Sequence, residues 1–175
     1  MGSALGDAGF NLVSGSGLTV APAALSGFLE SIQRSGSWDL ERRLLVRPFS
    51  QPIDGSQPND EQWAALRGEM ARVSGAVVFL GGGKLVDDRL VVAGGVHAER
   101  AAADSVGAFL LPVGSTGGAA AAIAHELVGS AIPSSGSGAR RPTDDELRRL
   151  LKARDASEIA GMTVRILKRF SDAAS

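Results

Sequence analysis

Short apolar runs alternate with amphipathic segments along this chain, and that alternation is typical of a strand–helix protein. Four apolar runs predict strands at residues 10–13, 44–46, 76–80 and 109–113. Their apolar positions are consecutive rather than alternating, which indicates burial on both faces and favours a parallel sheet. Because parallel strands need crossover connections, the pattern predicts an α/β fold.

Helical spacing of apolar residues fills the intervals between these strands. The predicted helices cover residues 4–9, 21–34, 60–74, 95–106, 119–128, 143–154 and 155–170. Gly9 should end the first helix, Pro22 suits the first turn of the second, and Thr143 with Glu146 forms a capping box. Residues 81–95 are predicted as a loop and 134–139 as a linker. The expected inward residues of the 60–74 helix are Trp63, Leu66, Met70 and Val73.

Three of the strands are followed by glycine-rich turns, at residues 14–18, 81–84 and 114–118. Glycine lets the backbone turn sharply and approach a ligand with no Cβ in the way. The helix that follows offers free N–H groups and the positive end of its dipole, which suits phosphate. One such turn is more often only a tight connection. Three at the carboxyl edge of one sheet favour a nucleotide or phosphate pocket.

Three charged residues near these turns are candidates for ligand contacts, and each has a plainer alternative. Arg47 ends a strand and could clamp a diphosphate, or it could cap carbonyls or pair with Asp54. Lys84 could supply a point charge to a phosphate or be a solvated loop lysine. Glu99, expected in the first turn of its helix, could bind ribose hydroxyls or simply favour the helix dipole. The spacing is not that of a Walker loop.

Composition limits the classes of function. The 175 residues suffice for one domain, and the net charge of −1 argues against nonspecific nucleic-acid binding. Cysteine is absent, so thiolate metal sites, disulfides and cysteine catalysis are excluded. His97 and His125 are far apart and are expected to be structural, with no metal site. No apolar run is long enough for a membrane span and no secretory signal is visible, so we expect a cytoplasmic location.

Three blocks of this sequence together resemble one known family. They are residues 9–17, residues 42–49 with the Arg-Pro-Phe motif, and a third block made of 75–84, 88–101 and 111–117. Their order and spacing are similar to those of the SLOG superfamily, and within it to the Sir2- or TIR-associated STALD sensor domains of Thoeris anti-phage effectors. The resemblance covers residues 4–170, and residues 1–3 are expected to be a remnant of expression.

The resemblance implies a Rossmann-like three-layer fold that binds a cyclic ADP-ribose isomer, without catalysis and without a cofactor. It implies a Sir2- or TIR-type effector domain as partner, in the same chain or another, and a homodimer or larger homo-oligomer. Arg47, Lys84 and Glu99 match its ligand-contacting residues. The full set of expected ligand-binding residues is Gly15, Ser16, Gly17, Leu18, Arg47, Phe49, Gly82, Gly83, Lys84, Glu99, Gly114, Ser115, Thr116 and Gly117. The family normally opens with a further strand, which we expect to be missing here.

Two other functions remain open from the sequence. The first is a nucleoside 5′-monophosphate phosphoribohydrolase of the lysine-decarboxylase-like branch, whose signature resembles Pro-Gly-Gly-x-Gly-Thr-x-x-Glu. The loop at 114–118 departs from it, because alanines follow and Glu126 comes too late. The second is DNA handling, which the near-neutral charge and the few aromatic residues (six Phe, two Trp) disfavour.

Overall fold

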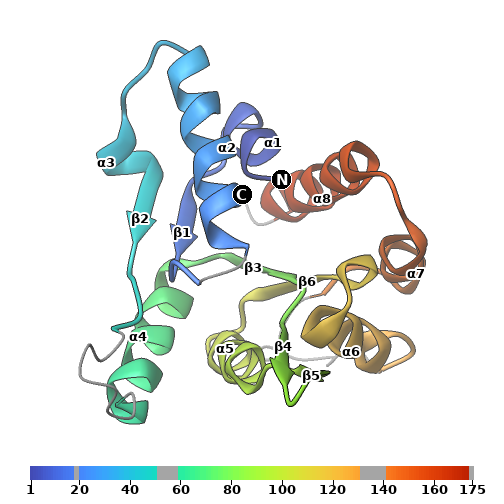
Figure 1. Cartoon of the computed structure of the whole chain (residues 1–175). Helices are drawn as coiled ribbons and strands as arrows, with labels where there is room; N and C mark the ends of the chain where they lie inside the picture. The colour runs from blue at the N-terminus through green and yellow to red at the C-terminus, as the bar shows by residue number, and fades with distance from the viewer. Residues whose placement is uncertain (18–19, 51–58, 131–140, 174–175) are drawn as a thin grey trace. The chain divides into compact units, whose positions relative to one another are not determined.

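The computed structural model describes residues 1–17, 20–50, 59–130 and 141–173. The chain divides into two compact units, Met1–Met70 and Ala71–Ser175. Each contains one pair of parallel strands, β1 (Leu12–Ser14) with β2 (Leu44–Val46) and β3 (Ala76–Leu80) with β6 (Phe109–Val113), flanked by helices (Figure 1). The α/β class and the parallel pairing predicted from the sequence are confirmed.

The first unit is built on two closely packed helices, α1 (Gly2–Asp7) and α2 (Ala21–Arg34). Gly6 of α1 permits the close approach, because a Cβ there would lie 2.5 Å from the Ser31 Oγ atom. Ser31 Oγ donates a 2.7 Å hydrogen bond to Asp7, and Arg34 donates to the same carboxylate at 2.9 Å. Phe28, from the same face of α2, is fully buried. The helix pair is therefore held by both apolar burial and a charged link.

α1 ends at the predicted glycine. Gly9 has φ +86°, its N–H donates to the Gly6 carbonyl, and the Phe10 N–H donates to the Leu5 carbonyl. These two bonds form a Schellman motif, which satisfies carbonyls that the helix end leaves open. The chain then enters β1, whose three residues pair in register with β2 from Leu12↔Leu44 to Ser14↔Val46. All six of these strand residues are only half-buried.

Two more helices belong to this part of the chain. α3 (Leu40–Arg43) is a single turn that the sequence did not predict. α4 (Asp60–Val73) begins at the two acidic residues expected in its first turn. One expected inward residue is wrong: Val73 is 58% exposed, and Ala71 is the buried residue near that end. Val73 lies in the last turn, two positions after Ala71. At about 100° per residue, its side chain therefore points away from the side on which Ala71 is buried.

The second unit has a larger core around β6, all five residues of which are buried. Four helices surround the β3–β6 pair: α5 (Gly94–Ser105), α6 (Gly118–Leu127), α7 (Asp144–Lys152) and α8 (Ala156–Asp172). Alanines of α6 allow that helix to lie close to the strands, with Ala119, Ala120 and Ile123 at 0% exposure. The Phe109 ring stacks on Phe170 of α8 at 4.5 Å between centroids.

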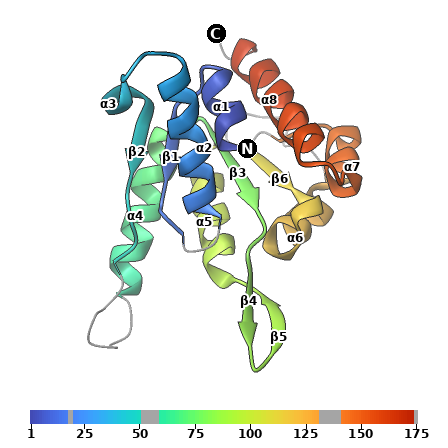
Figure 2. The same ribbon diagram turned by 45° about the horizontal axis from the view of Figure 1, so that its top comes forward.

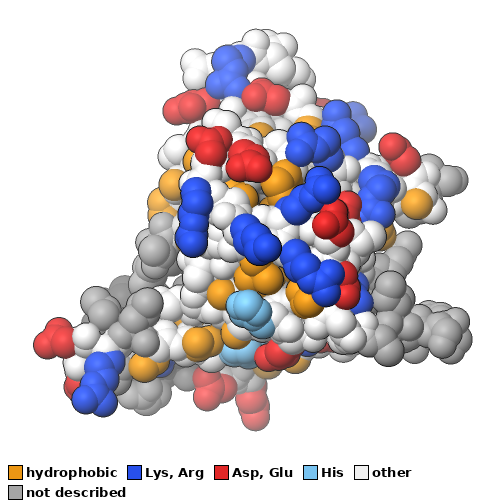
Figure 3. Space-filling view, turned by 90° about the vertical axis from the view of Figure 1, so that its right-hand side faces the viewer, with side chains coloured by type: hydrophobic (Ala, Val, Ile, Leu, Met, Phe, Trp, Pro, Cys, Tyr) orange, Lys and Arg blue, Asp and Glu red, His pale blue; other side chains and the backbone are white. Residues whose placement is uncertain are grey.

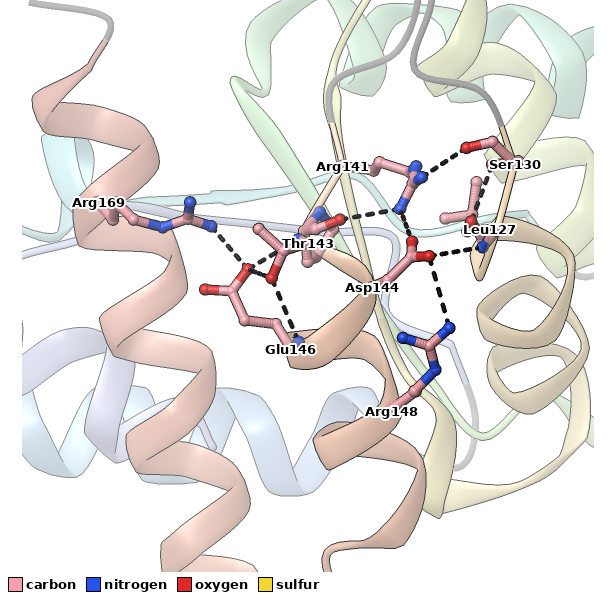
Figure 4. A network of polar contacts seen from close by, with 10 residues as sticks. Leu127, Ser130, Arg141, Thr143, Asp144, Glu146, Arg148 and Arg169 are labelled. Atoms are coloured by element: carbon pink, nitrogen blue, oxygen red, sulfur yellow. Dashed lines mark hydrogen bonds and ion pairs between the residues drawn. The ribbon is translucent and has the colours of Figure 1, made fainter.

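The start of α7 is fixed by the capping box that the sequence predicts (Figure 4). The Glu146 N–H donates to Thr143 Oγ1, and the Thr143 N–H donates back to Glu146 at 2.8 Å. Arg169 of α8 binds the same Glu146 carboxylate at 2.7 Å, so one acidic side chain both caps α7 and ties it to α8.

Residues 81–95 differ from the predicted loop. They contain an antiparallel hairpin, β4 (Gly83–Val86) with β5 (Arg89–Val92), which projects from the end of β3 in Figure 2. Asp87 and Asp88 form its two-residue turn with φ +48° and +58°. Two successive left-handed residues define the turn that matches strand twist in tight hairpins, and aspartate tolerates that conformation. Among the described residues the strands thus form three separate two-stranded ladders.

Within the described ranges, no helix has the length and apolar composition needed to cross a membrane. The predicted linker at 134–139 lies outside the described residues.

Candidate functional site

In the first unit, the ends of β1 and β2 bring together Gly15, Arg47 and Phe49. The Arg47 N–H donates to the Ser14 carbonyl at 2.8 Å, and the Phe49 N–H donates to the Gly15 carbonyl at 3.4 Å. The Phe49 ring lies against the Gly15 backbone, since a Cβ on Gly15 would be 2.6 Å from the ring. Gly15 is therefore required for close approach of an aromatic ring.

The rest of the first glycine turn is more open. Ser16 has φ +51°, and its N–H donates to Ser14 Oγ at 3.2 Å, so the turn is held locally. Gly17 is exposed, with no atom within 4 Å of an added Cβ. Leu18, the remaining predicted ligand residue here, lies outside the described residues.

Arg47 is paired with an acid of α4, and Asp54, the partner considered from the sequence, lies outside the described residues. Its Nε atom donates to Glu69 of α4 at 3.1 Å, and the two side chains are 42% and 48% exposed. A half-exposed pair of this kind contributes little to stability. The guanidinium keeps further donors, so it can bind a second anion beside Glu69.

An arginine that the sequence reasoning did not single out lies in the same cluster. The Arg67 guanidinium carbon lies 5.0 Å from the centre of the Phe49 ring and 5.6 Å from that of Trp63, and the two rings meet edge to face at 5.4 Å. Arg67 Nε is buried and has no hydrogen-bond partner among the described residues. The spacing of Trp63 and Arg67, one helical turn apart in α4, is the signal that would have pointed to it.

In the second unit, the other two glycine turns pack directly on each other. The Gly81 N–H donates to Thr116 Oγ1 at 2.8 Å, and that hydroxyl donates to the Val113 carbonyl at 2.6 Å. Gly118 has φ +56°, and a Cβ there would lie 2.7 Å from both Gly82 C and Gly83 N. The glycines of both turns are therefore needed for main-chain contact between the turns.

This contact changes the expectation for the start of α6. The Ala119 and Ala120 N–H groups donate to the carbonyls of Gly82 and Gly81 at 3.2 and 2.9 Å. Two of the first-turn donors that the sequence reasoning assigned to a phosphate are thus bonded to the neighbouring turn. Ser115 Oγ, in contrast, is buried with no partner among the described residues, so this hydroxyl is available to a ligand.

Lys84 lies on a strand instead of the expected loop, and Glu99 lies in the expected helix but one turn later than expected. Lys84 is exposed and lies on β4, opposite Val91, instead of closing a loop. Glu99 is half-buried in the second turn of α5, and the first turn of α5 holds no acidic residue. A favourable interaction with the helix dipole, which acts in the first turn, therefore does not explain an acid at position 99. The Ala93 N–H donates to the Gly82 carbonyl at 2.8 Å, which fastens the hairpin and α5 to the glycine turn.

Glu126, the acid considered for the phosphoribohydrolase hypothesis, has a structural partner. Glu126 forms an ion pair with Arg100 of α5, which also lies 3.5 Å from Asp104. Across the described part of the chain, no group of three His, Asp or Glu side chains could hold a metal ion.

Comparison with known proteins adds to this geometry. A model of the Sir2- and TIR-associating SLOG family (STALD) matches residues 1–170. Proteins named NAD(+) hydrolase ThsA are similar over part of the chain. The one from Bacillus cereus (strain MSX-D12) is 35% identical over 108 residues, 62% of this chain and 22% of the relative. Those from Cytobacillus dafuensis and Acinetobacter baumannii (strain 532279) are 34% identical over 110 residues (63% and 22%) and 25% identical over 134 residues (73% and 28%). The chain thus spans only about a quarter of the curated relatives that it matches.

Proposed function

Because the chain belongs to the Sir2- and TIR-associating SLOG family, we propose that it is the sensor domain for an NAD-derived cyclic nucleotide, a cyclic ADP-ribose isomer. The observation that carries the proposal is the family match over residues 1–170, joined to glycine turns that end β1, β3 and β6. The domain itself is non-catalytic. It regulates a Sir2- or TIR-type effector in anti-phage defence, in the same chain or in a partner, and acts as a homodimer or larger homo-oligomer.

The cluster of the first unit supports this proposal with suitable chemistry. Arg47 supplies a planar fork of donors that matches a diphosphate, and the Phe49–Trp63 pair supplies aromatic surface of the kind that nucleobases stack on. Arg67 adds a second guanidinium with one buried donor still unused. A diphosphate carries two negative charges, and the two arginines with Glu69 leave one net positive charge that attracts it.

The second unit supports it with three polar groups. Lys84 is an exposed cation for a phosphate oxygen, Glu99 accepts hydrogen bonds from ribose hydroxyls, and the buried Ser115 hydroxyl has no partner in the part of the chain that the structure describes. A ligand that binds one state of an oligomer better than another shifts the equilibrium between those states. That shift is how a non-catalytic domain would release an attached effector.

Titration calorimetry with cyclic ADP-ribose isomers tests the proposal, with linear ADP-ribose and NAD⁺ as comparison ligands. We expect saturable binding of at least one isomer. Arg47→Ala should weaken it by about 2 kcal/mol or more, roughly thirtyfold in Kd, because a charged diphosphate contact is lost. Absence of binding by every isomer at millimolar concentration, in a sample with native circular dichroism, would refute the sensor function.

Two controls separate ligand binding by Arg47 from a structural role. Arg42→Ala removes an arginine whose side chain is 84% exposed and makes just a long, 3.9 Å contact with Asp39, so ligand binding should not change. Glu69→Gln breaks the same ion pair as Arg47→Ala but leaves the guanidinium in place. If Arg47 binds the diphosphate, Glu69→Gln should preserve or strengthen binding. Equal weakening by Arg47→Ala and Glu69→Gln would instead assign Arg47 to the ion pair alone.

A further inference from the structure

A cavity lies in the second unit, and none of the residues that line it is among those predicted to bind the nucleotide. Its volume is about 430 Å³, and it is lined by His125 and Val128 at the end of α6 and by Arg148, Leu151 and Lys152 of α7. Leu151 and Lys152 follow Arg148 by three and four positions, which places both beside it on the helix surface. Cavities of a few hundred Å³ are the size that small-molecule ligands occupy.

Basic side chains line the cavity and no acidic one does, and two of the acids of α6 and α7 pair with arginines outside its wall. Glu126, the one acidic residue of α6, pairs with Arg100. Of the three acids of α7, Asp145 pairs with Arg149 at 3.0 Å and Glu146 with Arg169 at 2.7 Å.

Asp144 is the acid that lies near Arg148 of the cavity wall, and it is held mainly by a different arginine. Arg141 binds its carboxylate at 2.7 Å and the Gly129 N–H donates to it at 3.0 Å, whereas Arg148 stands at 3.7 Å (Figure 4). Lys152 forms no ion pair within the described part of the chain. Lys152 therefore faces the cavity without a carboxylate among the described residues, and Arg148 shares its acid, Asp144, with Arg141.

The same cavity has a firm apolar floor. Leu151 packs against the backbone of Gly114, where a Cβ would lie 2.4 Å from its Cδ2 atom. Val128 is half-buried beside it at the end of α6. Figure 3 looks onto the side of Figure 1 where α6, α7 and α8 lie, and it shows Lys and Arg side chains gathered next to a histidine and hydrophobic atoms. Positive rim and apolar floor together suit an anion that carries a hydrophobic group.

We propose that this cavity binds a small phosphate monoester with an apolar group, the phosphate lying between Arg148 and Lys152 and the apolar group on Val128 and Leu151. Arginine supplies bidentate donors to phosphate oxygens, and lysine supplies a point charge. His125 donates or accepts one further hydrogen bond at the rim. This site shares no residue with the proposed cyclic-nucleotide site, although Leu151 packs against Gly114 of that set.

Nuclear magnetic resonance of the whole protein tests the site, since the chain has only two histidines. Phenyl phosphate, the probe, should shift the imidazole signals of His125 in a saturable way and leave those of His97 in place. Inorganic phosphate, which lacks the apolar group, should bind more weakly at the same pH and ionic strength. His125→Gln assigns the signals.

A double variant and a matched control decide the outcome. Arg148→Gln with Lys152→Gln should weaken phenyl phosphate binding at least about tenfold, because two charge-assisted contacts are lost. Arg165→Gln with Lys168→Gln also removes one arginine and one lysine charge, but from exposed positions of α8, and should leave phenyl phosphate binding unchanged. Equal weakening by both pairs, no saturable His125 shift at millimolar probe, or tighter competition by a polyglutamate peptide would each overturn the proposal. Failure of cyclic nucleotides to bind would leave these signals as they are.

Discussion

Gly118 combines two constraints at a single residue. Its φ of +56° lies in the left-handed region, and a Cβ would stand 2.7 Å from main-chain atoms of Gly82 and Gly83. Neither neighbour is the end of a flexible side chain, so the chain cannot relieve the overlap by a rotamer change. The packing of the two glycine turns therefore depends on this position being glycine.

We expect Gly118→Ala to lower the free energy of unfolding by about 2–4 kcal/mol, from strain and overpacking together. Gly94→Ala is the matched control, because Gly94 has no atom within 4 Å of an added Cβ and begins α5 with an ordinary φ. That variant should be neutral or slightly stabilising. Urea unfolding of both proteins measures the difference. Equal stability of the two variants would contradict the close contact.

At the scale of helices and strands, strong local signals identified most elements. Pro22 and the apolar spacing gave the helix at 21–34, and the consecutive apolar residues gave the strand at 109–113, both with the observed bounds. The hairpin was missed because its turn is Asp87-Asp88 and not an asparagine–glycine pair, and because the preceding glycines suggested a loop. α3 is too short to show a helical period.

The candidate site was harder to predict than the elements. Sequence can place Arg47 after a strand, but the carboxylate that meets it comes from Glu69, 22 residues later in α4. In the same way, nothing local says that the Ala119 and Ala120 N–H groups bond to another turn. Such pairings depend on tertiary packing, which a single sequence does not show.

Asp144 joins α7 to the end of α6, and its charge should make stability depend on pH. The hydrogen bond from Arg141, with that from the Gly129 N–H, holds the pKa of Asp144 below its usual value. A depressed folded-state pKa adds stability above the unfolded value of about 3.9, and this stability is lost as pH falls through the folded value. Asp144→Asn should therefore lose stability at pH 7 and show a smaller further loss between pH 5 and about pH 2.

Urea midpoints across that pH range provide the measurement, and Asp145→Asn is the control. Asp145 is 71% exposed in its pair with Arg149, so its removal should leave the acid dependence nearly unchanged. An acid profile of Asp144→Asn that parallels that of the unsubstituted protein would exclude this carboxylate as a source of the pH dependence.

At the scale of the whole molecule, β6 of the second unit is buried more deeply than either parallel strand of the first unit. All residues of β6 are buried, whereas those of β1 and β2 are half-buried and the two strands have three residues each. Local opening requires less free energy where few apolar contacts must break. The two units should therefore differ in local stability, although the family match runs through both.

Hydrogen exchange of the intact chain measures that difference. We expect amides of residues 110–113 to exchange at least about tenfold more slowly than those of residues 12–14 and 44–46, apart from Pro112, which has no amide hydrogen. The α1–α2 helix pair, with buried Phe28 and Ile32, serves as an internal reference for the first unit. Uniform protection across both strand pairs would mean that the chain opens as one cooperative body.

The joined turns after β3 and β6 have a consequence for how mutational scans of this protein should be read. Four hydrogen bonds join Gly81 and Gly82 to neighbouring segments. Three of them run between backbone groups, from the N–H groups of Ala93, Ala119 and Ala120, and the fourth involves the Thr116 hydroxyl. Alanine substitution of side chains leaves those three bonds intact and removes only the one to Thr116, so an alanine scan would understate the importance of this region. Only a scan that enlarges residues, such as alanine or valine placed at Gly82 and Gly118, would reveal how strongly the protein relies on it.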